Sequence, residues 1–200
     1  MTLVADDTRQ PGHSESGTAC RLPVAADAAA DLASYPADLT VADLPRRDLD
    51  PAELEAVAAA VAQQPETWRH LVGFDSEERV YASLHRDAHV DIWLLCWTPE
   101  NDTGWHDHDV SSGAVAVVDG ELVENNLTLL SGARETSVGA GRVFSFGPDH
   151  IHRLNGARAG SVSIHAYSPP LWRMGQYSVD DAGTLRRVSL SYADELRPLD

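Results

Sequence analysis

The residues best suited to chemistry in this chain are histidines that recur at short spacing. The segment Trp105-His106-Asp107-His108 places two imidazoles two residues apart. In an extended strand such side chains share one face, roughly 7 Å apart. Two neutral imidazoles side by side can bind a divalent transition metal. We select His152, in Gly147-Pro148-Asp149-His150-Ile151-His152, as the third ligand, so the sequence predicts a metal site.

A second histidine competes for the third position. His150 lies two residues before His152 and shares its face if that segment is extended. On spacing alone His150 is an alternative ligand. Otherwise His150 contacts the metal ligands without binding the metal, or it faces solvent.

Polar residues also alternate with apolar ones in a later segment. Ser163, His165 and Tyr167 alternate with Ile164 and Ala166, so they line one face of a strand. Polar groups inside a small barrel are unfavourable unless they bond to one another or to a site. A Ser–His–Tyr relay would satisfy them, whereas the same alternation also suits a strand whose polar face meets water.

These residues must be positioned by strands, because short apolar runs alternate with turn signals from about residue 79 onward. No helical pattern interrupts the runs, which predicts an all-β jelly-roll barrel. The predicted strands are Val90–Trp97, Ala114–Val118, Glu121–Leu130, Arg142–Phe146, Ser161–Tyr167 and Leu185–Ser191.

One helix precedes the strands. Asp50 suits the N-cap, Pro51 the first helical position, and Glu53 completes a capping box. An apolar stripe follows at helical spacing and ends before Pro65. Residues 1–45 predict an irregular N-terminal arm, in which residues 27–34 could form a short helix, and residues 46–200 predict the barrel domain with this leading helix.

The composition of the chain limits the partners that it could bind. The chain has 200 residues, 43% of them hydrophobic, and a formal net charge of −16. That charge argues against nucleic acid and anionic membranes, which attract basic surfaces. The sequence has no apolar run long enough to cross a bilayer and no basic-then-apolar leader, so we expect a cytoplasmic protein. Its two cysteines predict no disulfide framework.

The two histidine blocks resemble the two motifs of the cupin superfamily, in which the first supplies two histidines and a carboxylate and the second one histidine. Here Gly113 stands at the carboxylate position, and the second motif is shifted by a residue around its proline. Three neutral imidazoles would leave the full 2+ charge on the metal. Such a centre can accept an anionic sulfur ligand.

A narrower resemblance covers roughly residues 70–192, by the extent of the motifs. Leu94-Leu95-Cys96-Trp97, His106-Asp107-His108, His152-Arg153 and Ser163-x-His165-x-Tyr167-Ser168-Pro169-Pro170 together resemble the cysteine dioxygenase family. The resemblance implies that Fe(II) on three histidines binds a thiol and O2, with both oxygen atoms ending on sulfur. It also implies metal ligands His106, His108 and His152, and a catalytic relay of Ser163, His165 and Tyr167.

The chain departs from this family at two places. Some members carry a cysteine that is cross-linked to the active-site tyrosine, and Gly113 takes that position, so we expect Tyr167 to be uncrosslinked. The Tyr-x-Arg element, whose arginine binds the substrate carboxylate, reads Arg79-Val80-Tyr81 in inverted order. The candidate substrate-binding residues are therefore Tyr81, Arg79 and Arg173, with Arg86 as a further arginine, unless the substrate is not free cysteine.

The sequence thus favours an iron(II) thiol dioxygenase that acts on cysteine, 3-mercaptopropionate or a thiol-histidine. Its expected partners are the thiol and O2, and a monomer is plausible. Two alternatives stay open: a non-catalytic cupin that senses a ligand or metal, and a zinc or manganese cupin isomerase or hydrolase. The Ser163–His165–Tyr167 face distinguishes the dioxygenase from the non-catalytic cupin, which has no need of a relay, and metal analysis with oxygen consumption on a panel of thiols would separate all three.

Overall fold

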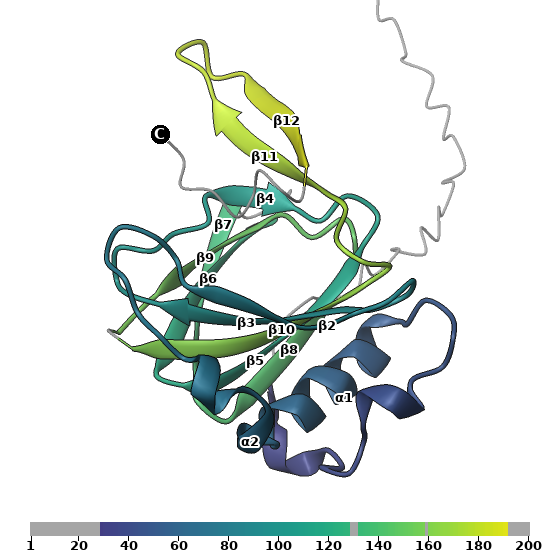
Figure 1. Cartoon of the computed structure of the whole chain (residues 1–200). Helices are drawn as coiled ribbons and strands as arrows, with labels where there is room; N and C mark the ends of the chain where they lie inside the picture. Colours follow the sequence, from purple (N-terminus) through teal and green to yellow (C-terminus); the bar gives the residue numbers. More distant parts are fainter. Residues whose placement is uncertain (1–28, 129–131, 159, 192–200) are drawn as a thin grey trace, which may run out of the picture.

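The computed structural model describes residues 29–128, 132–158 and 160–191 of the chain (Figure 1). Within these ranges the strands form two six-stranded antiparallel sheets, which face each other across the barrel. The first has the order β1-β8-β5-β10-β3-β2 and the second β12-β11-β4-β9-β6-β7. This arrangement confirms the predicted all-β jelly-roll barrel.

The strands of the first sheet are β1 (Ala30–Asp31), β2 (Tyr81–Arg86), β3 (Asp91–Trp97), β5 (Ser112–Asp119), β8 (Arg142–Phe146) and β10 (Ser161–Ser168). Those of the second are β4 (Trp105–Asp107), β6 (Glu121–Thr128), β7 (Gly132–Gly139), β9 (His152–Gly156), β11 (Arg173–Val179) and β12 (Leu185–Ser191). The strands predicted for β8 and β12 match residue for residue. The last two residues predicted for the strand from Glu121, 129 and 130, lie outside the described residues.

The central strand β10 separates two cores. Its apolar residues Val162, Ile164 and Ala166 belong to the core under the helices, while Tyr167 belongs to the core inside the barrel. Ser163 and His165 share the face of Tyr167 because side chains alternate along a strand. The predicted alternation is therefore confirmed, and it directs the polar face inward, away from solvent.

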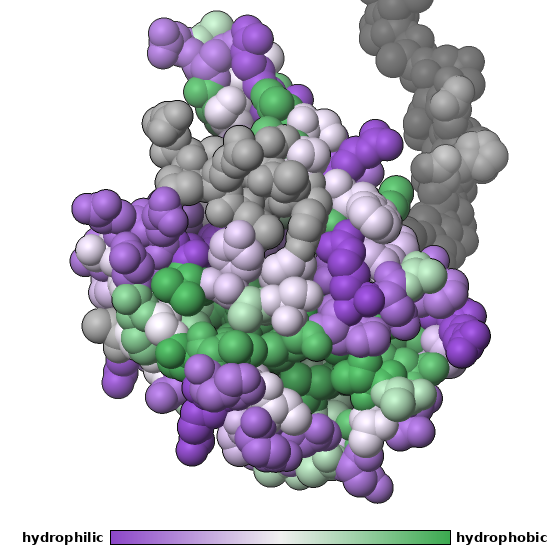
Figure 2. All heavy atoms as spheres, viewed as in Figure 1, coloured by the Kyte–Doolittle hydropathy of each residue, from purple (hydrophilic) through white to green (hydrophobic). Residues whose placement is uncertain are grey.

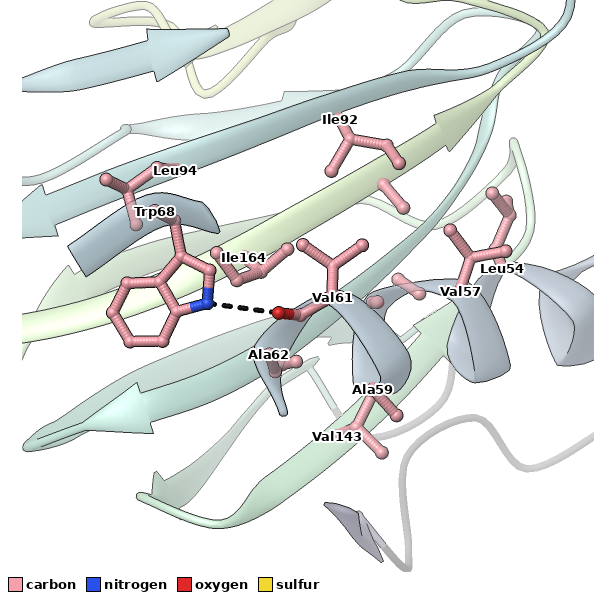
Figure 3. Packing of buried hydrophobic residues seen from close by; sticks show 14 of the residues in the cluster. Leu54, Val57, Ala59, Val61, Ala62, Trp68, Ile92, Leu94, Val143 and Ile164 are labelled. Carbon is pink, nitrogen blue, oxygen red and sulfur yellow. Dashed lines mark hydrogen bonds between the residues drawn. The ribbon is translucent and has the colours of Figure 1, made fainter. Parts of the chain in front are cut away.

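Helix α1 (Pro51–Ala62) packs against the outer face of the first sheet, as Figures 1 and 3 show. Its predicted capping box is confirmed: Asp50 accepts from the Glu53 N–H, and Glu53 accepts from the Asp50 N–H. The predicted apolar stripe is buried, and full burial of each large side chain contributes roughly 1.5–3 kcal/mol. The short helix α2 (Pro65–Trp68) closes this layer, where the Trp68 indole donates to the Val61 carbonyl at 3.0 Å (Figure 3).

The short helix considered for residues 27–34 is absent from the described part of that segment. Ala30 and Asp31 instead pair with β8 at the sheet edge, and residues 32–34 form a 3-10 turn. Asp31 caps this turn by accepting from the Ala33 N–H, an arrangement that replaces a longer helix. The buried Leu32 ties this part of the predicted arm to the domain core, whereas residues 1–28, including Cys20, lie outside the described residues.

Figure 2 shows hydrophilic side chains along the rim of this face, and hydrophilic side chains mixed with exposed hydrophobic ones over the β11–β12 hairpin, where Val179, Leu185 and Val188 are exposed. A band of hydrophobic side chains crosses the middle, level with β3 and β10 in Figure 1. No helix in the described part of the chain is both long and apolar enough to span a membrane.

Candidate metal centre

The structure brings the three predicted metal ligands together inside the barrel. His106 on β4 is the register partner of His152 on β9. His108 follows directly after β4, and Asp109 then turns the chain with a φ of 55°, a conformation that aspartate tolerates better than most residues. All three histidines are buried, and one ring nitrogen from each lies within 4.8 Å of the other two.

The protonation of these rings suits a metal. His106 Nδ1 lies 3.1 Å from the Gly104 carbonyl, to which it can only donate, so its Nε2 carries a lone pair. His108 Nδ1 and His152 Nε2 are buried without a hydrogen-bond partner. Burial, reinforced by the neighbouring imidazoles, holds the pKa of His108 and His152 well below its ordinary value, so both are neutral. Neutral imidazoles with unused buried nitrogens fit a divalent transition metal.

The fourth position of the usual cupin ligand set is blocked. A Cβ atom on Gly113 would lie 2.4 Å from Phe146 Cζ and 3.1 Å from Tyr167 Cδ1. Phe146 fills this space and stacks on the His108 ring, with centroids 4.8 Å apart. The side chain that usually completes the set is therefore replaced by an aromatic ring, and Gly113 offers no thiol to cross-link to Tyr167.

A buried carboxylate lies behind the triad, and the sequence reasoning missed it. Glu124 projects inward from β6, and its Oε1 lies 2.8 Å from His152 Nδ1 and 2.9 Å from His150 Nε2. His150 contacts Glu124 and lies outside the His106–His108–His152 group; with Glu124 and His152 it forms a second group whose ligand atoms lie within 4.8 Å of one another. The sequence did contain a signal for Glu124: it is an acidic residue two positions after Leu122, and therefore on the buried face of a predicted strand.

A chain of hydrogen bonds approaches the triad from the opposite sheet. The Trp97 indole donates to Ser163 Oγ at 2.9 Å, Ser163 Oγ lies 2.8 Å from His165 Nε2, and His165 Nδ1 lies 3.1 Å from the Tyr167 hydroxyl. The Tyr167 ring lies 5.1 Å from that of His108, between centroids. The three predicted relay residues are thus connected, and Trp97 is a fourth member that the sequence reasoning did not assign.

The relay histidine is neutral. Burial, together with the positive charge of Arg79 and the nearby His106 ring, lowers the pKa of His165 to about 3. A neutral imidazole has one donor and one acceptor nitrogen, so His165 can pass a hydrogen bond from Ser163 to Tyr167.

The four candidate substrate-binding residues lie in different places. The Arg79 guanidinium lies over the Trp97 ring, 5.1 Å from its centroid, and its charge reaches His165. Tyr81 lies 5.8 Å from Trp93, between ring centroids, and is partly exposed. Tyr81 is the first residue of β2, whereas Arg79 lies two residues before that strand begins.

The other two arginines, Arg86 and Arg173, lie elsewhere in the structure. Arg86 binds the buried Asp91 at 2.7 Å and lies over Trp172. Arg173 is exposed and precedes Met174, which packs inside the barrel, so its side chain points to the outer face. The structure does not bring Arg173 to the triad.

The middle residue of the His-x-His pair points away from the metal ligands. The Asp107 carboxylate accepts a bidentate pair of hydrogen bonds from Arg187 of β12, both at 2.7 Å. It also accepts a hydrogen bond of 2.6 Å from the Tyr177 hydroxyl of β11. Gly175 makes room for the guanidinium, since a Cβ there would lie 2.1 Å from Arg187 Nε. The β11–β12 hairpin thereby fixes the strand that carries the ligands.

A barrel of two antiparallel sheets with three inward histidines, two from one motif and one from a second, defines a cupin fold with a candidate metal site. The family model for cysteine dioxygenase type I matches residues 25–180, so the chain belongs to that family. The family points to a dioxygenase acting on a small-molecule thiol.

Solved structures show a more distant likeness. KdgF from Halomonas sp. is 12% identical, covering 50% of this chain and 84% of that one with a TM-score of 0.43. TT1209 from Thermus thermophilus is 15% identical, covering 51% and 92% with a TM-score of 0.44. A conserved protein with a double-stranded β-helix domain from Klebsiella pneumoniae is 14% identical, covering 50% and 80% with a TM-score of 0.45. Among curated proteins no match was found.

Proposed function

We propose that this protein is an iron(II)-dependent dioxygenase that converts a small-molecule thiol and O2 into the sulfinic acid, RSH + O2 → RSO2H. The observation that carries the proposal is the meeting of two features in one barrel. The three buried imidazoles provide ligands, and the Tyr167 ring lies 5.1 Å from that of His108, between centroids, with its hydroxyl hydrogen-bonded to His165.

The ligand set suits this chemistry because the carboxylate position is taken by Gly113 and Phe146. When bound, Fe(II) supplies a Lewis-acidic redox centre that can accept a thiolate and O2. His106, His108 and His152 would hold it without cancelling its charge. A centre that keeps its full 2+ charge favours an anionic ligand such as thiolate over a neutral oxygen ligand.

The relay provides a fixed donor at the edge of the site. Ser163 Oγ accepts the Trp97 N–H and keeps its own proton to donate. In the tautomer in which His165 Nε2 accepts that proton, His165 Nδ1–H donates to the Tyr167 oxygen. The Tyr167 hydroxyl can then donate its proton to the sulfur or oxygen atoms of the reactants. A preorganised donor of this kind stabilises charge as it develops without reorganisation.

Arg79 is the candidate that fits a substrate carboxylate. Its guanidinium presents a planar fork, which binds a carboxylate through two charge-assisted bonds. The Arg79 guanidinium lies over the ring of Trp97, which bonds to Ser163, so it lies on the relay side of the barrel. Cysteine, 3-mercaptopropionate and thiol-histidine all carry a carboxylate, and Arg79 would recognise the group that they share.

A panel of metals and thiols tests the proposal. The purified apoprotein is loaded anaerobically with Fe(II), Zn(II) or Mn(II), and O2 uptake is recorded with each thiol. We expect uptake only with Fe(II), and much weaker uptake with a thiol that lacks a carboxylate. Equal activity with Zn(II) on a non-thiol substrate would favour an isomerase or hydrolase. Tight ligand binding with no turnover would favour a sensor.

A further inference from the structure

Glu124 is a carboxylate in an unusual position. It lies on the inner face of β6, two residues after the fully buried Leu122, and its side chain is 1% exposed. Buried carboxylates are rare unless they are paired, because a charge removed from water is strongly destabilising. The partners on Glu124 Oε1 are two imidazoles, those of His152 at 2.8 Å and His150 at 2.9 Å.

This contact determines which nitrogen of His152 faces the metal. A carboxylate can only accept hydrogen bonds, so His152 Nδ1 must carry the proton that it donates to Glu124. The opposite nitrogen, Nε2, then carries the lone pair, and it is the buried ring nitrogen without a hydrogen-bond partner. The His152 ring therefore has one edge against a carboxylate and the other toward the triad.

His150 gives the carboxylate a second anchor. Its Nε2–H donates to the same oxygen, and its ring stacks on Phe146 with centroids 5.0 Å apart and planes 18° from parallel. Phe146 is also the residue that fills the space beside Gly113. The ring that excludes a carboxylate from the ligand set thus also supports the histidine that holds Glu124.

We infer that Glu124 is a positioning residue of the metal centre: it orients His152, fixes its tautomer, and places a negative charge one imidazole away from the ion. The inference rests on the proposed metal site. Through the ring of His152, Glu124 makes that ligand a stronger donor, while the ligand set itself stays neutral. His150 acts indirectly, because it holds the Glu124 carboxylate in position.

Anaerobic titration with Co(II) tests this role, because its visible absorption reports ligand geometry and strength independently of turnover. In Glu124→Gln the charge is lost although an acceptor oxygen remains. We expect Co(II) affinity to fall roughly 10–100-fold and the absorption bands to shift. The matched control is Glu121→Gln on the same strand, whose carboxylate contacts the exposed Arg158 at 3.5 Å. This control should retain the affinity and the spectrum of the unmodified protein.

A Glu124→Gln protein with unchanged affinity and spectrum would overturn the inference. The His106→Ala variant distinguishes a failure of this inference from a failure of the proposed function. If His106→Ala loses Co(II) while Glu124→Gln binds it as the unmodified protein does, the proposed metal site stands and only the role of Glu124 is refuted.

A second measurement needs no variant. In the unmodified apoprotein, nitrogen-15 NMR reports which ring nitrogen carries the proton. We expect His152 as the Nδ1–H tautomer with a strongly hydrogen-bonded proton. Observation of the Nε2–H tautomer would contradict the role of Glu124, whether or not the Glu124→Gln protein folds.

Discussion

Position 113 is a glycine for a packing reason as well as a chemical one. Any side chain there would meet the Phe146 ring, which stacks on His108. Overpacking of this kind forces side chains from their preferred rotamers. Two residues, Gly113 and Phe146, therefore keep a carboxylate out of the ligand set. Of these, only Gly113 could be recognised in the sequence as a departure from the motif.

Gly113→Ala tests this packing. We expect it to lower the free energy of unfolding of the apoprotein by about 1–3 kcal/mol, since the added methyl group clashes with Phe146. Urea unfolding measures the change. In a Phe146→Leu background the cost of the same substitution should be smaller, and an equal cost in both backgrounds would show that Phe146 is not the obstacle.

Tyr167→Phe tests the relay at its reactive end. The variant keeps the ring that packs near His108 and loses only the hydroxyl. We expect iron content to be unchanged and kcat to fall roughly 10²-fold, the usual cost of removing one preorganised donor. The control is Tyr35→Phe, which removes a hydroxyl bonded to Glu55 on α1. Unchanged turnover in Tyr167→Phe would remove the hydroxyl from the mechanism.

At the scale of elements, the β11–β12 hairpin supports the strand that carries the ligands. Partial burial raises the pKa of Asp107, but the bonds from Arg187 and Tyr177 outweigh it and hold that pKa well below its ordinary 3.8. A carboxylate whose folded pKa is depressed stabilises the fold above its unfolded pKa. This stability is lost as the pH falls through the folded value.

Arg187→Gln should therefore destabilise the apoprotein at neutral pH by about 1 kcal/mol, a modest value because the pair is partly exposed. The difference from the unmodified protein should shrink as the pH falls below 3.8, where Asp107 takes up a proton in the unfolded chain and the ion pair no longer contributes. Urea unfolding over a pH series measures it. A difference that persists undiminished in acid would contradict the ion pair.

The elements also show what sequence can predict. Helix α1 was predictable because its capping box and apolar stripe are local signals. Strand β10 was predictable because its polar and apolar residues alternate. The edge strand β7 was not, since most of its residues are exposed and carry no apolar period.

The limits of the site prediction have the same origin. The three predicted metal ligands and the three predicted relay residues lie in compact motifs, and the structure brings the members of each set together. The contact of Glu124 with His150 depends on the register between two strands, which no local pattern encodes. The outward direction of Arg173 likewise follows from the position of β11, which no predicted strand included.

At the scale of the whole molecule, the barrel keeps several imidazoles neutral in a protein of strongly negative charge. Burial, with the positive charge of Arg79 and the nearby His106 ring, lowers the pKa of His165 from 6.5 to about 3. Below pH 6.5 the unfolded chain binds a proton at His165 that the folded protein does not. Stability contributed by this group is thus complete above pH 6.5 and declines toward pH 3.

The apoprotein should accordingly lose stability between neutral pH and pH 5. In His165→Gln one of the contributing imidazoles is absent, so stability should fall less steeply over that interval. Urea unfolding of both proteins at the two pH values compares the slopes. Parallel slopes would mean that His165 takes up a proton as readily in the folded protein as in the unfolded chain.

The most direct test of the central claim is the fate of isotopic oxygen. Fe(II)-loaded protein is incubated with a carboxylate-bearing thiol under ¹⁸O2, and the product is analysed by mass spectrometry. We predict a sulfinate carrying both labelled atoms, and none with His106→Ala, which should also lack iron. A product without label, or full iron content and turnover in His106→Ala, would contradict a three-histidine thiol dioxygenase.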